Sequence, residues 1–275
     1  MTFSIVASDG SAWGVAVASK FLAVGCAVPA AAADAGAIAT QSYANLAYRP
    51  DGLGHLRGGK SAQETLDALT AADDGREQRQ AGIVDTHGNA ATYTGSACHD
   101  WAGGRTGASY AIQGNILTGP DVVEAMERAW LATSPDQPLA RRLYAALVAG
   151  DDAGGDKRGR QSAAILVAAT EGGYADSTDI VVDLRVDDSP APIPELGRLL
   201  DLHDLYFGKA DPDAALPLEG DLADEVRRRL ASLGHAQDDL DAALNDWAGV
   251  ENFEERMLAG KIDPTVLEQL RQKST

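Results

Sequence analysis

Cysteine is scarce in this sequence, which has only Cys26 and Cys98 in 275 residues. A disulfide-stabilised scaffold needs more cysteines than this, and a zinc site built on thiolates would need other ligands as well. The two cysteines favour a reducing compartment, so we expect a cytoplasmic protein. The opening residues 1–7 agree with this expectation, because they carry neither the basic start nor the long apolar segment of a signal peptide.

Basic residues are also few. The chain has 23 Lys and Arg against 41 Asp and Glu, which gives a formal net charge of −18. Binding to a phosphate backbone or to an anionic membrane surface requires clustered positive charge, and no run approaches the roughly 20 apolar residues that span a bilayer. We therefore expect neither nucleic acid nor a membrane as a partner.

Signals for metals and cofactors are missing as well. The five histidines are scattered and form no HExxH pair, and no phosphate-binding or dinucleotide-binding glycine motif follows a strand. We expect no metal and no cofactor. The histidines are His55, His87, His99, His203 and His235.

Short apolar runs of strand type dominate the first hundred residues. Residues 3–7 and 13–18 flank Asp9-Gly10, a strong hairpin signal. Further strands are predicted at Gly25–Pro29, Ala37–Ser42, Gly82–Val84, Ala90–Thr94, Gln161–Ala169 and Ile180–Val186. The sequence therefore predicts several strands in the first hundred residues and a return to strand after residue 160.

Helices are predicted between these strands. Ser61-Ala62-Gln63-Glu64 is a capping box that opens a helix to about Ala72, and Asp121 is placed to cap a second one. A third covers Leu139–Ala149 and ends at Gly150, and a fourth begins near Glu195. Strands, then two helices, then strands is not the regular alternation of a parallel α/β sheet, so we predict an antiparallel sandwich with helices on its outer faces.

The end of the chain has a different pattern. Asp211-Pro212-Asp213 and Pro217 mark a linker, and short amphipathic helices are predicted at Asp221–Leu233, Asp238–Trp247 and Pro264–Arg271. Leu222, Val226, Leu230 and Leu233 recur at helical spacing and should line the core of a three-helix module. We expect one α+β domain over residues 1–208 and a small all-α domain over residues 209–275.

Thr2 is the most informative single residue. Methionine excision acts on chains whose second side chain is small, so the mature protein is expected to begin with threonine. An α-amino group has an ordinary pKa near 8 and is close enough to working pH to take a proton from the neighbouring hydroxyl. Nucleophile and base would then belong to one residue. The alternative is an ordinary Met-Thr start without chemical meaning.

Several unusual strings occur together in a set order. They are Thr2–Ala7, Gly14–Val17, Ala23–Gly25, Ala39–Gln41, Gln80–Asp85, Gln113–Asn115, Ala153–Ala164 and Asp183–Asp188. Over about residues 1–200 the chain resembles the domain of unknown function 1028 family. This resemblance implies a four-layer αββα sandwich of the N-terminal-nucleophile hydrolase type, but no settled reaction. One departure is Ser189, at a place where family members commonly have histidine.

The resemblance and the residue chemistry together select the candidate site. The second strand ends in Ser19-Lys20, where such folds place a polar residue near the nucleophile, and Gln113-Gly114-Asn115 is predicted to be a donor-rich turn. The cationic segment from Asp156 to Ser162 is a candidate anion site. The candidate catalytic residues are Thr2, Ser19, Lys20, Asn115, Asp156 and Ser162, and the candidate substrate-binding residues are Gln41, Asn45, Gln113, Arg158, Arg160 and Gln161.

Each of these segments also has a structural interpretation. Lys20 could be a solvated strand end, and the amides of the predicted turn could bond to their own backbone. The cationic segment could be a loop paired with nearby aspartates, which are Asp151, Asp152, Asp187 and Asp188.

The tail resembles a peptidoglycan-binding domain, most clearly at Asn252–Arg256 and Ile262-Asp263. That resemblance implies a peptidoglycan fragment as a partner, although a subunit contact in a homo-oligomer suits a cytoplasmic chain better. Two functions are open: an amide hydrolase acting on a small amide or ureido compound, or a non-catalytic protein that recognises peptidoglycan fragments or a protein partner.

Overall fold

The Asp9-Gly10 hairpin forms as predicted. The computed structural model, which describes residues 2–274, pairs β1 (Thr2–Ser8) with β2 (Ala12–Ser19) in antiparallel register. Gly10 has a φ of 94°, a left-handed conformation that glycine adopts without a steric penalty. Every residue of both strands is buried, so this hairpin lies at the centre of the sheet and is covered on both faces.

The chain divides into two units between Leu200 and Asp201, and two antiparallel sheets form the first unit. The larger sheet has the strand order β10-β9-β2-β1-β8-β7, and the smaller has the order β3-β4-β5-β6. The bounds in the larger sheet are β7 (Gly103–Gly107), β8 (Tyr110–Asn115), β9 (Ser162–Ala169) and β10 (Ile180–Val186). Those in the smaller are β3 (Pro29–Ala32), β4 (Gly36–Ser42), β5 (Arg79–Asp85) and β6 (Ala90–Thr94).

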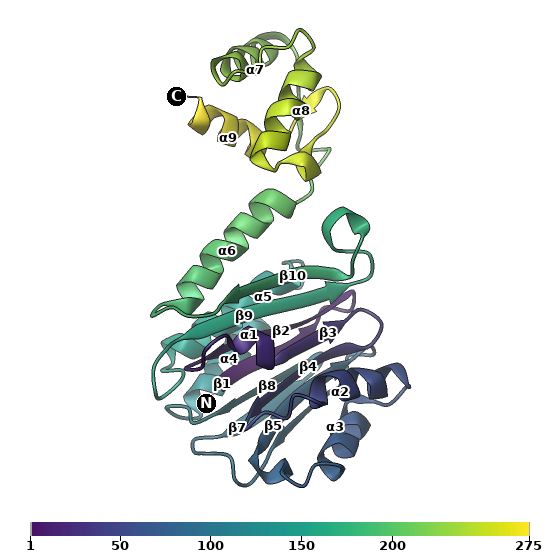
Figure 1. Cartoon of the computed structure of the whole chain (residues 1–275), viewed down its shortest axis with the longest axis vertical. Helices are drawn as coiled ribbons and strands as arrows, with labels where there is room; N and C mark the ends of the chain where they lie inside the picture. Colours follow the sequence, from purple (N-terminus) through teal and green to yellow (C-terminus); the bar gives the residue numbers. More distant parts are fainter. Residues whose placement is uncertain (1, 275) are drawn as a thin grey trace. The chain divides into compact units, whose positions relative to one another are not determined.

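Separate apolar cores define the layers of this α+β unit. One core, which includes Val6, Val15 and Val84, fills the space between the two sheets. A second packs α4 (Asp121–Ala132) and α5 (Leu139–Asp152) on the outer face of the larger sheet. A third packs α2 (Tyr48–Arg57) and α3 (Ala62–Ala71) on the smaller one. Figure 1 shows these helices outside the paired sheets, so the layers run helix, sheet, sheet, helix.

The predicted helices are present, with corrected ends. The capping box at Ser61 and Glu64 is formed, with both reciprocal hydrogen bonds. Asp121 is not a cap, because α4 has Pro120 at that position without a side-chain hydrogen bond. α5 continues past Gly150 to Asp152, and α6 (Pro192–Phe207) begins three residues before Glu195.

The predicted strand Gly25–Pro29 is wrong. Its residues form a short helix, α1 (Val24–Ala27), and Pro29 begins β3. A Cβ on Gly25 would lie 2.7 Å from the Ala164 Cβ on β9, so glycine permits this close contact. A short apolar run does not distinguish a strand from one turn of buried helix. A helix at α2 was not predicted from the sequence. Its Pro50 is tolerated because it falls in the first turn.

The second unit has its own helical core. It contains α7 (Gly220–Ser232), α8 (Leu240–Glu251), α9 (Pro264–Lys273) and a small antiparallel pair, β11 (Leu216–Pro217) and β12 (Lys261–Ile262). Val226 and Leu230 are fully buried, and Leu222 and Leu233 pack beside them, which confirms the predicted apolar face. Within residues 2–274, no helix has the length and apolar character needed to cross a bilayer.

Candidate functional site

Strand alternation directs Thr2 toward the space between the sheets. Phe3, Ile5 and Ala7 belong to the core on the helix-covered face, whereas Val6 belongs to the core between the sheets. Thr2 shares the orientation of Val6, because side chains two and four residues apart lie on the same face of a strand. The first described residue therefore begins a buried central strand and faces the opposite sheet.

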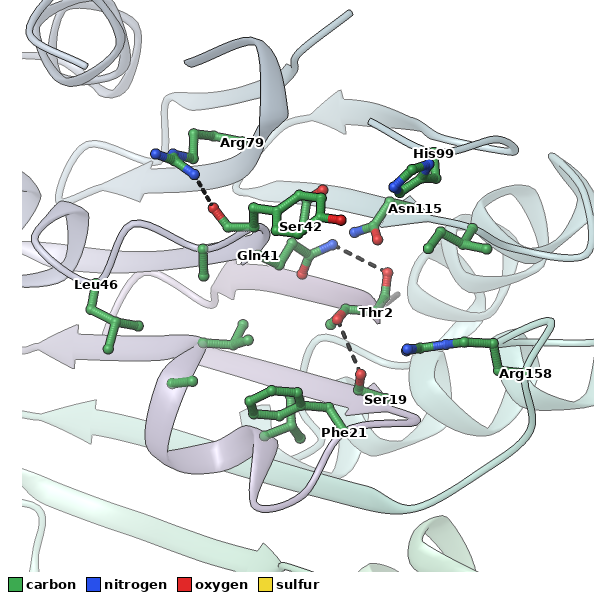
Figure 2. Close-up of a pocket in the computed structure, with 16 residues that line it drawn as sticks. Thr2, Ser19, Phe21, Gln41, Ser42, Leu46, Arg79, His99, Asn115 and Arg158 are labelled. Carbon is green, nitrogen blue, oxygen red and sulfur yellow. Dashed lines mark hydrogen bonds between the residues drawn. The ribbon is translucent and has the colours of Figure 1, made fainter. Parts of the chain in front are cut away.

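A cavity of about 560 Å³ opens at this end of the two sheets. Its polar lining includes Thr2, Ser19, Gln41, Ser42, Asn115, Arg79, His99 and Arg158. Its apolar lining includes Phe21, Val24, Ala27, Val28, Tyr43, Ala44, Leu46 and Ile116. Figure 2 shows the Thr2 side chain among these groups. Five of the predicted site residues, Thr2, Ser19, Gln41, Asn115 and Arg158, thus meet at one cavity.

Thr2 has a polar neighbour on each side. Its hydroxyl lies 3.1 Å from the Ser19 hydroxyl on β2, and its Cα is in register with that of Asn115 on β8. Side chains directly opposite on antiparallel strands have Cβ atoms about 4.5–5.5 Å apart. The Gln41 side-chain amide from β4 donates to the Thr2 carbonyl at 3.3 Å. Thr2 is 5% exposed, so it is buried and still borders the cavity.

A buried network of hydrogen-bonded side chains, mostly amides, holds the residues around Thr2 in position. The Gln41 Nε2 donates to the Gln80 Oε1 at 2.8 Å, and the Asn115 Nδ2 donates to the same oxygen at 2.9 Å. Gln113 donates to the Ser4 hydroxyl at 2.6 Å, and that hydroxyl donates to the Gln41 Oε1 at 2.7 Å. All five side chains are at most 1% exposed. Because each is bonded, the network fixes the two residues that reach the cavity, Gln41 and Asn115.

The Asp156 carboxylate organises the loop that carries Arg158. It accepts from the Lys20 backbone N–H at 2.7 Å and from the Arg158 backbone N–H at 2.8 Å. It also pairs with the Arg158 guanidinium at 3.3 Å. Asp156 is 7% exposed, and the Lys20 ammonium donates to the Arg160 carbonyl at 3.3 Å. The contacts found for Asp156 and Lys20 thus join loops, while Arg158 reaches the cavity.

The remaining predicted residues have other partners. The Ser162 hydroxyl binds the backbone of Phe21 and Val24, so it fastens the loop after β2. Asn45 donates to Asp73, Arg160 pairs with Asp151, and Gln161 donates to Asp188. Arg160 and Gln161 therefore behave as the structural alternative predicted, since each belongs to a loop that contacts a nearby aspartate. The predicted turn at Gln113–Asn115 is wrong, because these residues are the end of β8.

Arg79 forms part of the cavity wall and was not selected from the sequence. Its guanidinium pairs with Asp73 at 2.8 Å and donates to the Tyr43 carbonyl at 2.6 Å. The hydrogen bond with Asp73 raises the pKa of Arg79, and the same bond holds the pKa of Asp73 well below its usual range. This ion pair fixes the loop after β4 that carries Tyr43.

Other lining residues were missed as well, chiefly Phe21, Leu46 and His99. His99 is adjacent to Cys98 in the sequence, but its spacing matched no motif, and the apolar residues carry no chemical signal. Within the described part of the chain, no group of three or more His, Cys, Asp or Glu side chains could hold a metal ion. The polar lining of the cavity consists mainly of hydroxyls, carboxamides and guanidinium groups.

Comparisons with known proteins agree with this architecture. The model of the "Family of unknown function (DUF1028)" matches residues 2–196, and that of the "Putative peptidoglycan binding domain" matches residues 206–270. A crystal structure of protein SPO2555 from Silicibacter pomeroyi, also assigned to the first of these families, is 34% identical with a TM-score of 0.66. The match covers 82% of this chain and 92% of that one. A search of curated proteins finds no match.

Proposed function

Because the chain belongs to the family of unknown function DUF1028, we propose that its first unit is an amide hydrolase of the N-terminal-nucleophile type, with Thr2 as the nucleophile. The observation that carries this proposal is the position of the Thr2 hydroxyl, at the start of a buried central strand, beside the Ser19 hydroxyl and at the wall of a cavity. The proposed substrate is a small amide or ureido compound.

Removal of Met1 would place a free amine on the same residue as this hydroxyl. In the first step the Thr2 oxygen bonds to the substrate carbonyl carbon, and the hydroxyl proton passes to the amine. The carbon–nitrogen bond then breaks, and the proton moves to the leaving nitrogen. In the second step water attacks the ester with the same amine as base, which releases a carboxylic acid and restores Thr2.

The neighbouring residues suit supporting roles in this chemistry. Gln41 binds the Thr2 carbonyl and so fixes the backbone next to the amine. Asn115 lies opposite Thr2 and its amide borders the cavity, where it can orient a substrate carbonyl. The helix–sheet–sheet–helix order supports assignment to the N-terminal-nucleophile class, whose usual reaction is amide hydrolysis.

A sulfonyl fluoride tests this proposal without knowledge of the substrate. Phenylmethylsulfonyl fluoride reacts with activated hydroxyls, so we expect a mass increase on the peptide that begins with Thr2. The matched control is Thr2→Ala, which should not be labelled. Absence of label on Thr2 in the protein whose Met1 has been removed would contradict the mechanism.

The match over residues 206–270 favours a second candidate function for the molecule. In this alternative the chain is a non-catalytic protein that recognises peptidoglycan fragments or a protein partner through the second unit. Binding of a muropeptide, measured by calorimetry, should then persist in Thr2→Ala and vanish when residues 206–275 are removed. Unchanged binding after that removal would contradict the alternative.

Domain limits of 1–208 and 209–275, a cytoplasmic location and a homo-oligomer remain predictions.

A further inference from the structure

The charged side chains that line the cavity at Thr2 are arginines in a strongly acidic protein, and each arginine pairs with an aspartate outside the lining. The chain has 41 Asp and Glu against 23 Lys and Arg. Among the described residues that line the cavity, however, the ionisable side chains are Tyr43, Arg79, His99 and Arg158, and none is Asp or Glu. Exclusion of carboxylates from one cavity of such a chain indicates an anionic ligand.

The two arginine side chains differ in exposure, which is 19% for Arg79 and 44% for Arg158. Arg79 contacts Asp73 through Nε and Nη2 and the Tyr43 carbonyl through Nη1, so its fork is directed at the protein. Arg158 pairs with Asp156 through Nη2 at 3.3 Å, and its side chain is 44% exposed. Figure 2 shows the Arg158 guanidinium pointing toward Thr2 and Ser19. Arg158 is therefore the cation best placed to bind a carboxylate near the nucleophile.

The opposite wall is apolar and open. Phe21, Tyr43 and Leu46 are 52%, 56% and 48% exposed, and all three line the cavity. Val24 and Val28 also line the cavity and are 1% and 3% exposed. In Figure 2, Leu46 and Arg158 lie on opposite sides of Thr2. Large apolar side chains that gather at a concave surface next to a few polar groups are typical of a ligand site.

We propose that the substrate is an N-acyl amino acid, with its carboxylate bound by Arg158 and its apolar acyl chain packed against Phe21 and Leu46. This assignment deepens the proposed function and rests on it. The acyl group stays on Thr2 between the two steps, so an apolar wall can retain it while the free amino acid leaves. Attack of water on the Thr2 ester then releases the acyl group as a carboxylic acid.

Three probes test the contributions of Arg158 and of the apolar wall to binding separately. They are hexanoylglycine, hexanoylglycinamide and acetylglycine. Binding is measured by calorimetry on full-length Thr2→Ala, which cannot form the ester. A charge-assisted hydrogen bond contributes about 1.5–3 kcal/mol, so hexanoylglycine should bind about tenfold or more tightly than the amide. Acetylglycine has four methylene groups fewer than hexanoylglycine and should bind about tenfold or more weakly.

Two variants in the same background assign these preferences to residues. Arg158→Gln should bring hexanoylglycine to the affinity of the amide, whereas Arg105→Gln should not. Arg105 is the matched control, because it is similarly exposed and paired with acids but lies outside the cavity lining. Leu46→Ala should weaken hexanoylglycine but not acetylglycine, and Leu131→Ala, an exposed leucine elsewhere, should change neither.

The outcomes separate this assignment from the proposed reaction. Equal binding of the acid and the amide, no binding of hexanoylglycine, or equal effects of Arg158→Gln and Arg105→Gln would overturn the substrate assignment. Selective binding without cleavage by the unmodified protein would support an N-acyl amino acid as the ligand but contradict the hydrolase. Cleavage of all three probes at similar rates would support the hydrolase and overturn the assignment.

Discussion

The Thr2 hydroxyl lies in surroundings unlike those of a surface threonine. It is 5% exposed, it begins a strand whose every residue is buried, and its nearest polar partner is another hydroxyl, that of Ser19. A hydroxyl fixed in this way is oriented before a substrate arrives, which lowers the entropic cost of attack.

Ser19 should therefore influence the reactivity of Thr2. Replacing Ser19 with Ala removes the 3.1 Å contact while leaving the small buried volume nearly filled. Since a neutral hydrogen bond contributes about 0.5–1.5 kcal/mol, the rate of sulfonyl labelling of Thr2 should fall roughly twofold to tenfold. Ser11→Ala on the exposed hairpin turn is the control. An unchanged rate in Ser19→Ala would show that this contact does not orient the nucleophile.

The amide network below Thr2 should be sensitive to loss of any member. Gln80 accepts from Gln41 and Asn115 and donates to the Gly114 carbonyl at 2.7 Å. Gln80→Leu would leave several buried groups without partners, each at a cost of about 1–3 kcal/mol. We expect the free energy of unfolding in urea to fall by about 2–4 kcal/mol. A loss below about 0.5 kcal/mol would mean that the network contributes little.

At the scale of the elements, one glycine allows the two sheets to approach. A Cβ on Gly82 of β5 would lie 2.1 Å from the Gln113 Oε1 of β8, and Gln113 is fully buried. Gly82→Ala should therefore destabilise the first unit by about 1–3 kcal/mol through overpacking.

Gly54 provides the matched comparison. It lies exposed in α2, and a Cβ there would meet nothing within 4 Å. Gly54→Ala should stabilise the unit by about 0.5–1 kcal/mol, because alanine loses less backbone entropy in a helix. Both changes can be measured by urea unfolding. Equal effects of the two substitutions would contradict the close approach of the sheets.

How far the sequence predicts these elements depends on whether the signal is local. The capping box and the Asp9-Gly10 hairpin are determined by neighbouring residues, and both were predicted correctly. Gln113–Asn115 resembles a turn, but its amides face the other sheet and find partners far along the chain, such as Gln80. Lining residues such as Phe21 and Arg79 come together only through the pairing of distant strands, so the sequence pattern could not select them.

At the scale of the whole molecule, two units with separate cores should respond separately to pH. In the second unit, hydrogen bonds from Arg271 and Arg229 lower the pKa of Glu225 to about 2. A carboxyl whose pKa is lower in the folded state stabilises that state above its unfolded value, near 4.5. The contribution is lost as the pH falls from about 4.5 through about 2.

Hydrogen exchange can follow this loss in α7 alone. Protection of α7 should decrease over that pH range in the unmodified chain, and Glu225→Gln should lower the protection near pH 7 and flatten the pH dependence. Glu268→Gln, at an exposed site on α9, is the control. If the protection of α7 had the same pH dependence in the unmodified chain and in Glu225→Gln, ionisation of the Glu225 carboxyl would not be linked to folding.

The dependence of Thr2 labelling on pH tests the central claim most directly. If the free amine of Thr2 is the base, the labelling rate should rise with pH through a midpoint near the ordinary α-amino value of about 8. A chain with one lysine inserted between Met1 and Thr2, which keeps the added residues, should lose both the labelling and this midpoint. Equal labelling and the same pH profile in the two chains would contradict Thr2 as an N-terminal nucleophile.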